Sequence, residues 1–352
     1  MISKRTISRA GLAIALAFSF TLQGTQDVKA QDVHFTQFNA TPMLINPAFT
    51  GNFSGRARAS AIYRDQWRSV TVPFKTIAVS VDAPVVTDLT LDDYLAVGVQ
   101  LYNDRAGDAN LSNLSALASV AYHKFLGANV NKVISVGFQG GYAQKSFDLT
   151  KLYFSGDFVN DQFVPGAGGS TLNNKVDYFL FNAGLSWAHA AGENFSYVIG
   201  LGANNINQPL ETFDRREDLA DVGLGMRYNA QIGAIAYVSD KLSLRPAFLY
   251  QSQANATEMV AGNEFHLIVG DPEFRTYTTA VFLGGWYRFD DAMMVSAGLE
   301  FKGFRLGLAY DYTVSSLKNA AKSTGGFEIA LTWIAPDPLD FARKLIYPCS
   351  RF

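Results

Sequence analysis

The sequence contains few of the residue types on which disulfides and metal sites depend. It has one cysteine, Cys349, and four histidines among its 352 residues. One cysteine cannot form a disulfide within the chain. The histidines, His34, His123, His189 and His266, include no pair four residues apart, the spacing that places two imidazoles on one side of a helix in zinc enzymes. We therefore expect no metal and no other cofactor.

Long apolar runs are also missing after residue 30. No stretch of about eighteen apolar residues occurs there, so we expect no membrane-spanning helix. The first residues differ, because a basic start and an apolar stretch at 11–22 lead to Ala30 and Gln31. This layout is typical of a secretory signal peptide. We expect cleavage after Ala30 and export of the mature chain.

The charge of the chain argues against nucleic acid as a partner. Charged residues make up 17% of the sequence, and the formal net charge is −2. Removing residues 1–30 removes four positive charges and one negative charge, so the mature chain carries −5. A mildly acidic chain without a run of basic residues lacks the positive charge that binds nucleic acid.

What the sequence does contain is glycine, aromatic residues and a repeated strand pattern. It has 30 Gly, 16 Tyr and 27 Phe. About ten residues of alternating character are followed, again and again, by polar turn residues. The repeat predicts fourteen strands, at 55–65, 74–83, 94–104, 112–124, 131–147, 176–188, 196–206, 222–237, 241–254, 257–269, 275–289, 292–301, 304–314 and 325–333. Strands of this length, when tilted, cross a bilayer.

The alternation separates a lipid face from a lumen face. Phe304, Leu306 and Leu308 share one side of their strand, and Arg305 and Gly307 share the other. The same division runs through three further segments: 95–102, 294–301 and 325–333. An open sheet edge would leave backbone groups without hydrogen-bond partners in lipid. We therefore predict an all-β fold, a closed antiparallel transmembrane β-barrel of about fourteen strands.

The chain divides into four parts around this barrel: a signal peptide (1–30), an N-terminal segment (31–54), the barrel (55–334) and a C-terminal tail (335–352). The N-terminal segment and the tail lack alternation, and we expect them to plug the lumen or to dock a partner.

The connections between the strands are unequal. Long polar connections at 148–175 and 207–221 belong on the outer side, and short turns belong on the periplasmic side. The turn at 289–291 is short but falls on the side of the long loops, which leaves the strand count open around 257–292.

Charged residues on the lumen face are the candidate binding site. They are Arg227, Arg245, Glu300, Arg305, Asp311 and Glu328. One interpretation is an internal salt-bridge network that stiffens the barrel. The other is a surface that grips an inserted peptide or plug.

Catalytic spacing is hard to find. The sequence has no Gly-x-Ser-x-Gly elbow, and the nearest approach to a serine–histidine pair is Ser186, three residues before His189. The glycines at 200–202 and 223–225 precede no helix and so do not form a phosphate loop. We expect the protein not to be an enzyme.

Several motifs occur in an order typical of one family. The mature start, residues 31–38, leads to Asn46-Pro47-Ala48-Phe49 and Gly51. Further motifs are Tyr63-Arg64-Asp65-Gln66-Trp67, Asp104-Arg105-Ala106-Gly107, Trp286-Tyr287-Arg288, Tyr310-Asp311-Tyr312, Gly325-Gly326-Phe327-Glu328 and Cys349-Ser350-Arg351-Phe352. Over the whole mature chain they resemble the PorP/SprF family of Bacteroidetes. Thr36 and Phe38 stand where that family usually has Ser and Tyr.

The resemblance implies an integral outer-membrane protein of the type IX secretion and gliding machinery. Known relatives either accompany a secreted adhesin, whose C-terminal targeting domain they are thought to receive, or associate with periplasmic components of that machinery. We expect the first role, with a secreted adhesin or its targeting domain, other secretion components and membrane lipid as partners. A periplasmic docking role and a solute channel are the alternatives, since one fold serves many functions.

Overall fold

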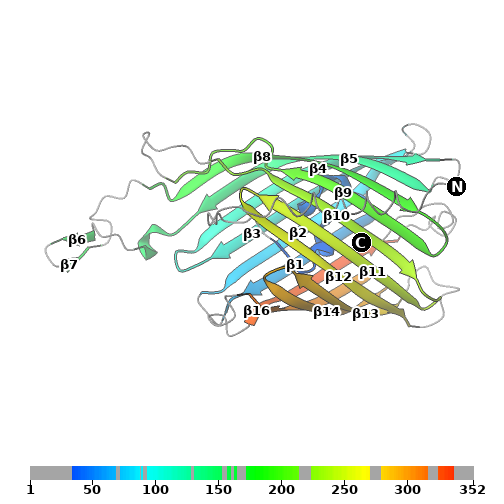
Figure 1. Ribbon diagram of the computed structural model, residues 1–352. Coiled ribbons are helices and arrows are strands. Elements are labelled where there is room, and N and C mark those ends of the chain that lie inside the picture. The colour runs from blue at the N-terminus through cyan, green and yellow to red at the C-terminus, as the bar shows by residue number, and fades with distance from the viewer. Residues whose placement is uncertain are drawn as a thin grey trace, which may run out of the picture.

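The computed structural model describes residues 34–68, 72–87, 89, 93–127, 131–152, 157–159, 162–164, 172–213, 223–269, 279–315 and 324–336. Within these ranges, fourteen antiparallel strands form one closed barrel (Figure 1). The predicted fold class is therefore confirmed. No helix in the described ranges is long and apolar enough to cross a membrane. The expected cleavage site after Ala30 and the tail from residue 337 lie outside the described residues.

Each barrel strand pairs with its neighbours in the sequence, and the first strand closes on the last. The strands are β1 (Ala57–Gln66), β2 (Phe74–Thr87), β3 (Asp93–Ala106), β4 (Leu111–Leu126), β5 (Lys132–Ser146), β8 (Lys175–Ala190), β9 (Phe195–Asn204), β10 (Arg227–Tyr237), β11 (Leu242–Gln253), β12 (Ala256–Ile268), β13 (Ala280–Arg288), β14 (Ala292–Phe301), β15 (Phe304–Thr313) and β16 (Thr324–Ala335). A small hairpin of β6 (Phe158–Val159) and β7 (Gln162–Phe163) stands apart from the barrel, in a connection that the sequence predicted as a plain loop.

The even number of strands puts both ends of the barrel on one side. Short turns, such as Lys302-Gly303, lie on that side. Lys302 (φ 49°) and Gly303 (φ 83°) both have the positive φ that a tight hairpin requires. The long connections at 147–174 and 205–226 lie on the opposite side, which the rule for such barrels makes the outer side. The short turn at 289–291 is also an outer connection, so the predicted count holds through 257–292.

The barrel wall is higher on one side than on the other. The strands β3, β4, β5 and β8, here called the high wall, have 14–16 residues, whereas β13, β14 and β15, the low wall, have 9 or 10. The extra length lies at the outer end, where Lys175–Asn182 of β8 continue past the last pair with β9, Ala183–Ala203 (Figure 1). The outer mouth is therefore slanted.

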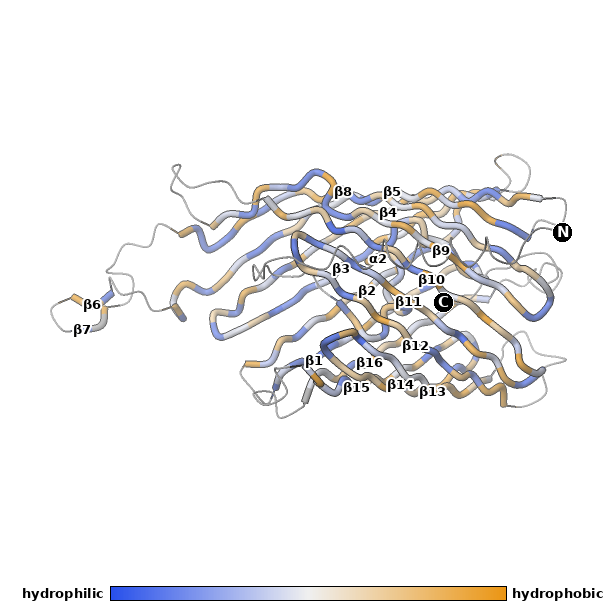
Figure 2. Tube along the Cα trace, in the orientation of Figure 1, coloured by the Kyte–Doolittle hydropathy of each residue, from blue (hydrophilic) through white to orange (hydrophobic). Residues whose placement is uncertain are grey.

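The two faces of the wall are those that the alternation predicted. Leu306 and Leu308 are exposed on the outer surface, whereas Gly307, Ala309 and Asp311 are buried on the inner one. Hydropathy alternates along the strands in the same way (Figure 2). Apolar outward side chains suit lipid, and small or polar inward ones suit a filled lumen.

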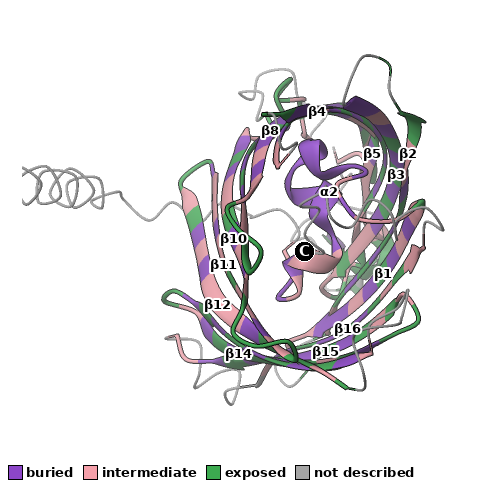
Figure 3. Cartoon of the chain, turned by 90° about the vertical axis from the view of Figure 1, so that its right-hand side faces the viewer, coloured by how far each residue is buried: buried purple, intermediate pink, exposed green. Residues whose placement is uncertain are grey.

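The N-terminal residues occupy the lumen. Residues 34–54, here called the plug, contain two short 3-10 helices and one turn of α-helix: η1 (Phe38–Ala40), α2 (Pro42–Ile45) and η2 (Pro47–Phe49). Pro42 and Pro47 each begin a helix, where the missing N–H of proline costs no hydrogen bond. Residues 41–51 are all buried inside the ring of strands (Figure 3).

Candidate functional site in the plugged lumen

The side chain of Asn46 joins the plug to the barrel wall. Its Oδ1 accepts a hydrogen bond of 2.9 Å from the backbone N–H of Ala48, which caps η2. Its Nδ2 donates to the backbone carbonyls of Leu185 in β8 (3.0 Å) and Leu201 in β9 (3.2 Å). One amide therefore shapes its own turn and holds it against two neighbouring strands.

This close approach depends on a glycine seat in the wall. The inward positions beneath the motif are Gly137, Gly184, Gly200 and Gly202. A Cβ at Gly137 would lie 2.3 Å from the backbone carbon of Pro47, and one at Gly184 would lie 1.9 Å from Oδ1 of Asn46. Only glycine leaves room for the plug backbone at such positions. The Asn46-Pro47-Ala48-Phe49 motif is therefore a docking segment that fits this seat.

The end of the motif is fixed at the periplasmic end of the barrel. Gly51 (φ 71°) donates its N–H to Asp82 of β2 over 2.7 Å. Arg58 of β1 forms a two-pronged ion pair with the same carboxylate (2.9 and 2.6 Å) and also donates to the carbonyl of Phe49 (3.0 Å). Arg58 and Asp82 are both buried. Charge-assisted bonds of this kind are roughly twice as strong as neutral ones.

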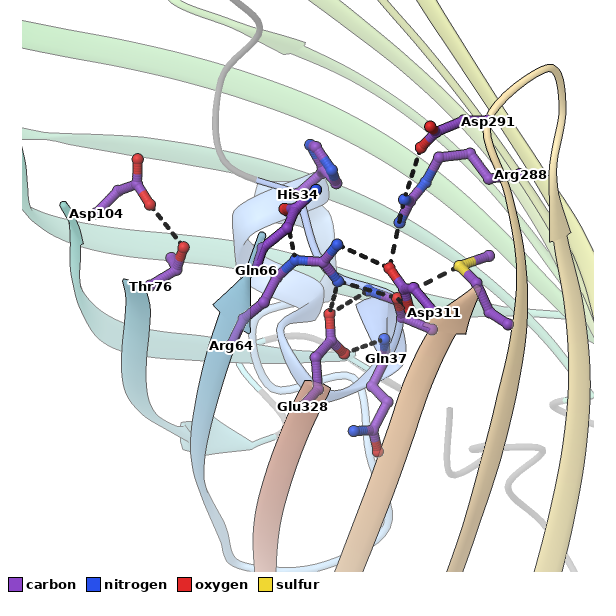
Figure 4. A network of polar contacts seen from close by, with 12 residues as sticks. His34, Gln37, Arg64, Gln66, Thr76, Asp104, Arg288, Asp291, Asp311 and Glu328 are labelled. Carbon is purple, nitrogen blue, oxygen red and sulfur yellow. Dashed lines mark hydrogen bonds and ion pairs between the residues drawn. The ribbon is translucent and has the colours of Figure 1, made fainter. Parts of the chain in front are cut away.

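The other end of the plug is held by a buried charge network (Figure 4). Arg64 of β1 forms ion pairs with Glu328 and with Asp311, the latter over 2.7 Å. Thr36 of the plug donates its N–H to Glu328 (2.7 Å) and its hydroxyl to Asp311 (2.5 Å). Arg288 lies 3.5 Å from Asp311 and adds a second positive charge. The plug thus completes the hydrogen bonding of two buried carboxylates.

His34, the first described residue of the plug, lies near the outer end of the lumen. Its Nδ1 lies 3.7 Å from Glu258, the third residue of β12, next to an outer turn. Loss of water around the ring lowers the pKa of His34, and the Glu258 carboxylate opposes that shift. The plug therefore runs from the outer end of the lumen to the periplasmic start of β1.

The last carbonyls of α2 are bonded by strand side chains. The last four C=O groups of a helix have no partner within the helix. Here Arg227 Nη2 (3.1 Å) and Asn204 (3.2 Å) donate to the carbonyl of Leu44, and Asn229 (2.8 Å) donates to that of Ile45. Arg227, a predicted binding residue, therefore binds the chain's own plug.

The remaining predicted lumen charges lie together in a second network. Arg305 donates to Glu300 (2.8 Å) and to Glu264 (2.7 Å), and Arg245 lies 3.4 Å from Glu300. His266 bonds to Glu264 over 2.9 Å. The structure thus brings Arg245, Glu300 and Arg305 together and places Asp311 in the other network. Glu264 was not among the predicted site residues, although the alternation along β12 places it on the inward face of the barrel.

The other family-motif residues lie at the outer ends of β1 and β3. Tyr63 faces outward, and Gln66 accepts a hydrogen bond of 3.2 Å from Arg64. Trp67 (φ 60°) follows the end of β1. Asp104 accepts a hydrogen bond of 2.6 Å from the hydroxyl of Thr76. Gly107 (φ 69°) begins the turn to β4, and glycine adopts this conformation without strain. These residues shape the outer rim.

The serine and histidine considered for catalysis lie on opposite faces of β8. Ser186 is buried on the inner face, and His189 is on the outer one. A different pair does exist, because His123 bonds to Ser135 over 2.7 Å through Nδ1. Its Nε2 bonds to the carbonyl of Thr50 in the plug (2.8 Å), and both side chains of the pair are buried. This pair anchors the plug.

Small cavities lie between the plug and the barrel wall. Two cavities beside the plug, near Asn39 and Arg305, have volumes of about 10 and 40 Å³. Such volumes hold about one to a few water molecules. On the outer side, the described part of the β9–β10 connection folds against the high wall, where Glu211 accepts from Tyr178 (2.8 Å) and pairs with Lys145. The plug and this loop thus both occupy the interior of the barrel.

Comparisons with known proteins found similar solved structures and one family. Two of the similar solved structures are the toluene transporters TbuX of Ralstonia pickettii (9% identity, 84% of this chain and 94% of that chain, TM-score 0.45) and TodX of Pseudomonas putida (11%, 86% and 94%, 0.45). No curated protein sequence matches the chain. The sequence model described as "Type IX secretion system membrane protein PorP/SprF" matches residues 27–333. Because this match covers most of the chain, the protein belongs to the PorP/SprF family of type IX secretion system membrane proteins, and it lies in the outer membrane.

Proposed function

We propose that this barrel binds a secreted surface protein, an adhesin or its C-terminal targeting domain, at its outer mouth and helps to deliver or anchor it. Family membership gives the coarse role, an outer-membrane barrel of type IX secretion. The observation that carries the finer role is the plugged lumen, because a barrel whose interior holds its own N-terminal segment leaves less of that interior for a solute. The slanted outer mouth is the surface that we propose for the partner.

The outer side carries apolar side chains that contact little of the chain itself. In the β6–β7 hairpin, Phe158 is 66% exposed and Val159 42%, and Val164, directly after β7, is 45% exposed. Figure 1 shows this hairpin away from the barrel strands. Exposed apolar side chains that lie close together are candidates for contact with another protein. The hairpin projects beyond the barrel strands, so these three residues are the proposed contact with the partner.

The lumen arginines have a narrower role in this proposal. A partner loop inserted among Arg227, Arg245 and Arg305 would have to replace bonds that Arg227 makes to the plug and that Arg305 makes to Glu264 and Glu300. A buried polar group that loses its hydrogen-bond partner costs about 1–3 kcal/mol. We therefore place the partner on the outer rim, with the plug in its seat.

The test is to delete the gene and to restore either the wild type or the variant Phe158→Ser/Val159→Ser/Val164→Ser. Surface display of one or a few large secreted proteins is expected to fail in the deletion and in the variant, while other type IX substrates continue. The variant Lys151→Ser, at an exposed polar position of the same connection, should restore display. Loss of all substrates together would favour the periplasmic docking role. Loss of nutrient uptake alone would favour a solute channel.

A further inference from the structure

One amide lies in the middle of the apolar outward face. Asn263 belongs to β12 (Ala256–Ile268), and its neighbours on the same face of that strand are Ala261 and Phe265. In the described strands, every other outward side chain with a charge, an amide or an aliphatic hydroxyl lies within four residues of a strand end. An amide at this depth finds no hydrogen-bond partner in lipid.

The described residues supply no partner for this amide either. Oδ1 of Asn263 is buried and accepts no hydrogen bond from any described group. The residues paired with Asn263 are Pro246 of β11 and Gly285 of β13, neither of which has a side-chain donor. Buried amides in folded proteins are nearly always hydrogen-bonded. The amide therefore indicates a partner that comes from outside this chain.

The same three residues form a row of low relief on the outer wall. Pro246 and Gly285 are exposed on the outward face, and the space where a Cβ of Gly285 would project is open. On the periplasmic side of the row, Phe265 and Leu283 project from the wall and are 51% and 63% exposed. Asn263 thus lies in a shallow hollow across three strands, beside large apolar side chains.

We propose that this face binds a second copy of the chain, with Asn263 at the two-fold axis. Two copies in one membrane have the same orientation, so their Asn263 side chains lie at the same depth. An amide carries both a donor and an acceptor, and two facing amides can exchange two hydrogen bonds. A two-fold contact joins the same patch on both subunits, which such a self-complementary group permits.

The shape of the face fits this contact. Barrel strands are tilted by roughly 35–45°, so the two β12 strands cross instead of lying parallel. Phe265 of one copy then lies over the low row of the other copy, at Pro246 or Gly285, and not over the second Phe265. The apolar packing supplies contact area, and the amide pair fixes the register, as one buried asparagine does between coiled helices.

The test measures self-association of the full-length barrel in lipid vesicles. Donor and acceptor dyes are attached to separate copies at one cysteine, Lys302→Cys, in a Cys349→Ser background. Energy transfer should rise with the ratio of protein to lipid as dimers form. Asn263→Leu should raise the ratio at half association at least tenfold, because the amide pair is lost. Asn263→Gln, which keeps an amide, should give a smaller shift.

The matched control for the loss of an amide is Gln144→Leu, at an outward position near the outer end of β5. It should associate as the wild type does, and heat-resistant migration on gels should show that all variants are folded. Monomers at every ratio of protein to lipid would overturn the proposal. Dimers whose association Asn263→Leu leaves unchanged would do the same.

Crosslinking between cysteines tests which face carries the contact. In the Cys349→Ser background, a short bifunctional maleimide should join two copies of Gly285→Cys, one strand away from Asn263. It should not join copies of Ala118→Cys, an outward position on β4. Equal crosslinking of the two variants would overturn the proposed face. Crosslinks in whole cells from Gly285→Cys only to a different membrane protein would overturn the second copy as the partner.

Discussion

At the scale of single residues, one asparagine holds the plug through both ends of its side-chain amide. Asn46 caps its own turn through Oδ1 and reaches two strand carbonyls through Nδ2. Leaving such buried groups without a partner costs about 1–3 kcal/mol each. The bonds form because Gly184 and Gly202 carry no side chain that would keep the plug away from the sheet.

The glycine seat gives a sharp prediction. In Gly137→Ala, the new methyl group would lie 2.3 Å from the backbone of Pro47, which cannot rotate away. Overpacking of this kind typically costs about 1–3 kcal/mol. We expect the barrel to remain folded and the plug to become sensitive to limited proteolysis, measured by mass spectrometry of the released N-terminal fragment.

The control for this prediction is Gly307→Ala. Its methyl group would lie 2.1 Å from Oε1 of Gln37, the end of a flexible side chain that can turn aside. The plug of this variant should therefore stay as resistant to protease as the wild type. Equal cleavage of the two variants would show that the plug does not depend on the seat.

Some of these residues could be predicted from the sequence and others could not. Alternation placed Asp311 and Glu328 on the inward face of their strands. It could not supply their partners, because a contact such as that of Arg227 with the carbonyl of Leu44 joins positions 183 residues apart. No local pattern in the sequence encodes a contact of that range.

At the scale of elements, the strands were predictable because each has a repeat of two that is visible within ten residues. The predicted starts at 222 and 275 were too early, because β10 begins at Arg227 and β13 at Ala280. The plug was not predictable as a structure. Its helices have three or four residues each, too few to show a helical repeat, and the barrel fixes their shape.

The alternation predicts opposite effects for two neighbouring residues of β15. Leu308 faces lipid, so Leu308→Arg should cost about 2–4 kcal/mol near the middle of the bilayer. Gly307 faces the plug, so Gly307→Ser should cost much less, since only the end of Gln37 has to move. Chemical unfolding in lipid vesicles measures both, and equal losses would contradict the strand register.

At the scale of the whole molecule, the plugged lumen and the slanted mouth favour docking over conduction. The two cavities described beside the plug, about 10 and 40 Å³, each hold only about one to a few water molecules. The full-length protein in a planar bilayer should therefore pass no steady ionic current above background. A steady current from the folded wild type would support the solute-channel alternative.

The central claim is that a secreted protein binds the outer mouth of a plugged barrel. The most direct measurement is photo-crosslinking in living cells, with a photoreactive amino acid at position 158 or 164 on the outer side, or at 302 in a periplasmic turn. We predict a crosslink from 158 and 164 to a large secreted surface protein, and none to that protein from 302. Crosslinks only from position 302, to a periplasmic component of the secretion machinery, would contradict the account.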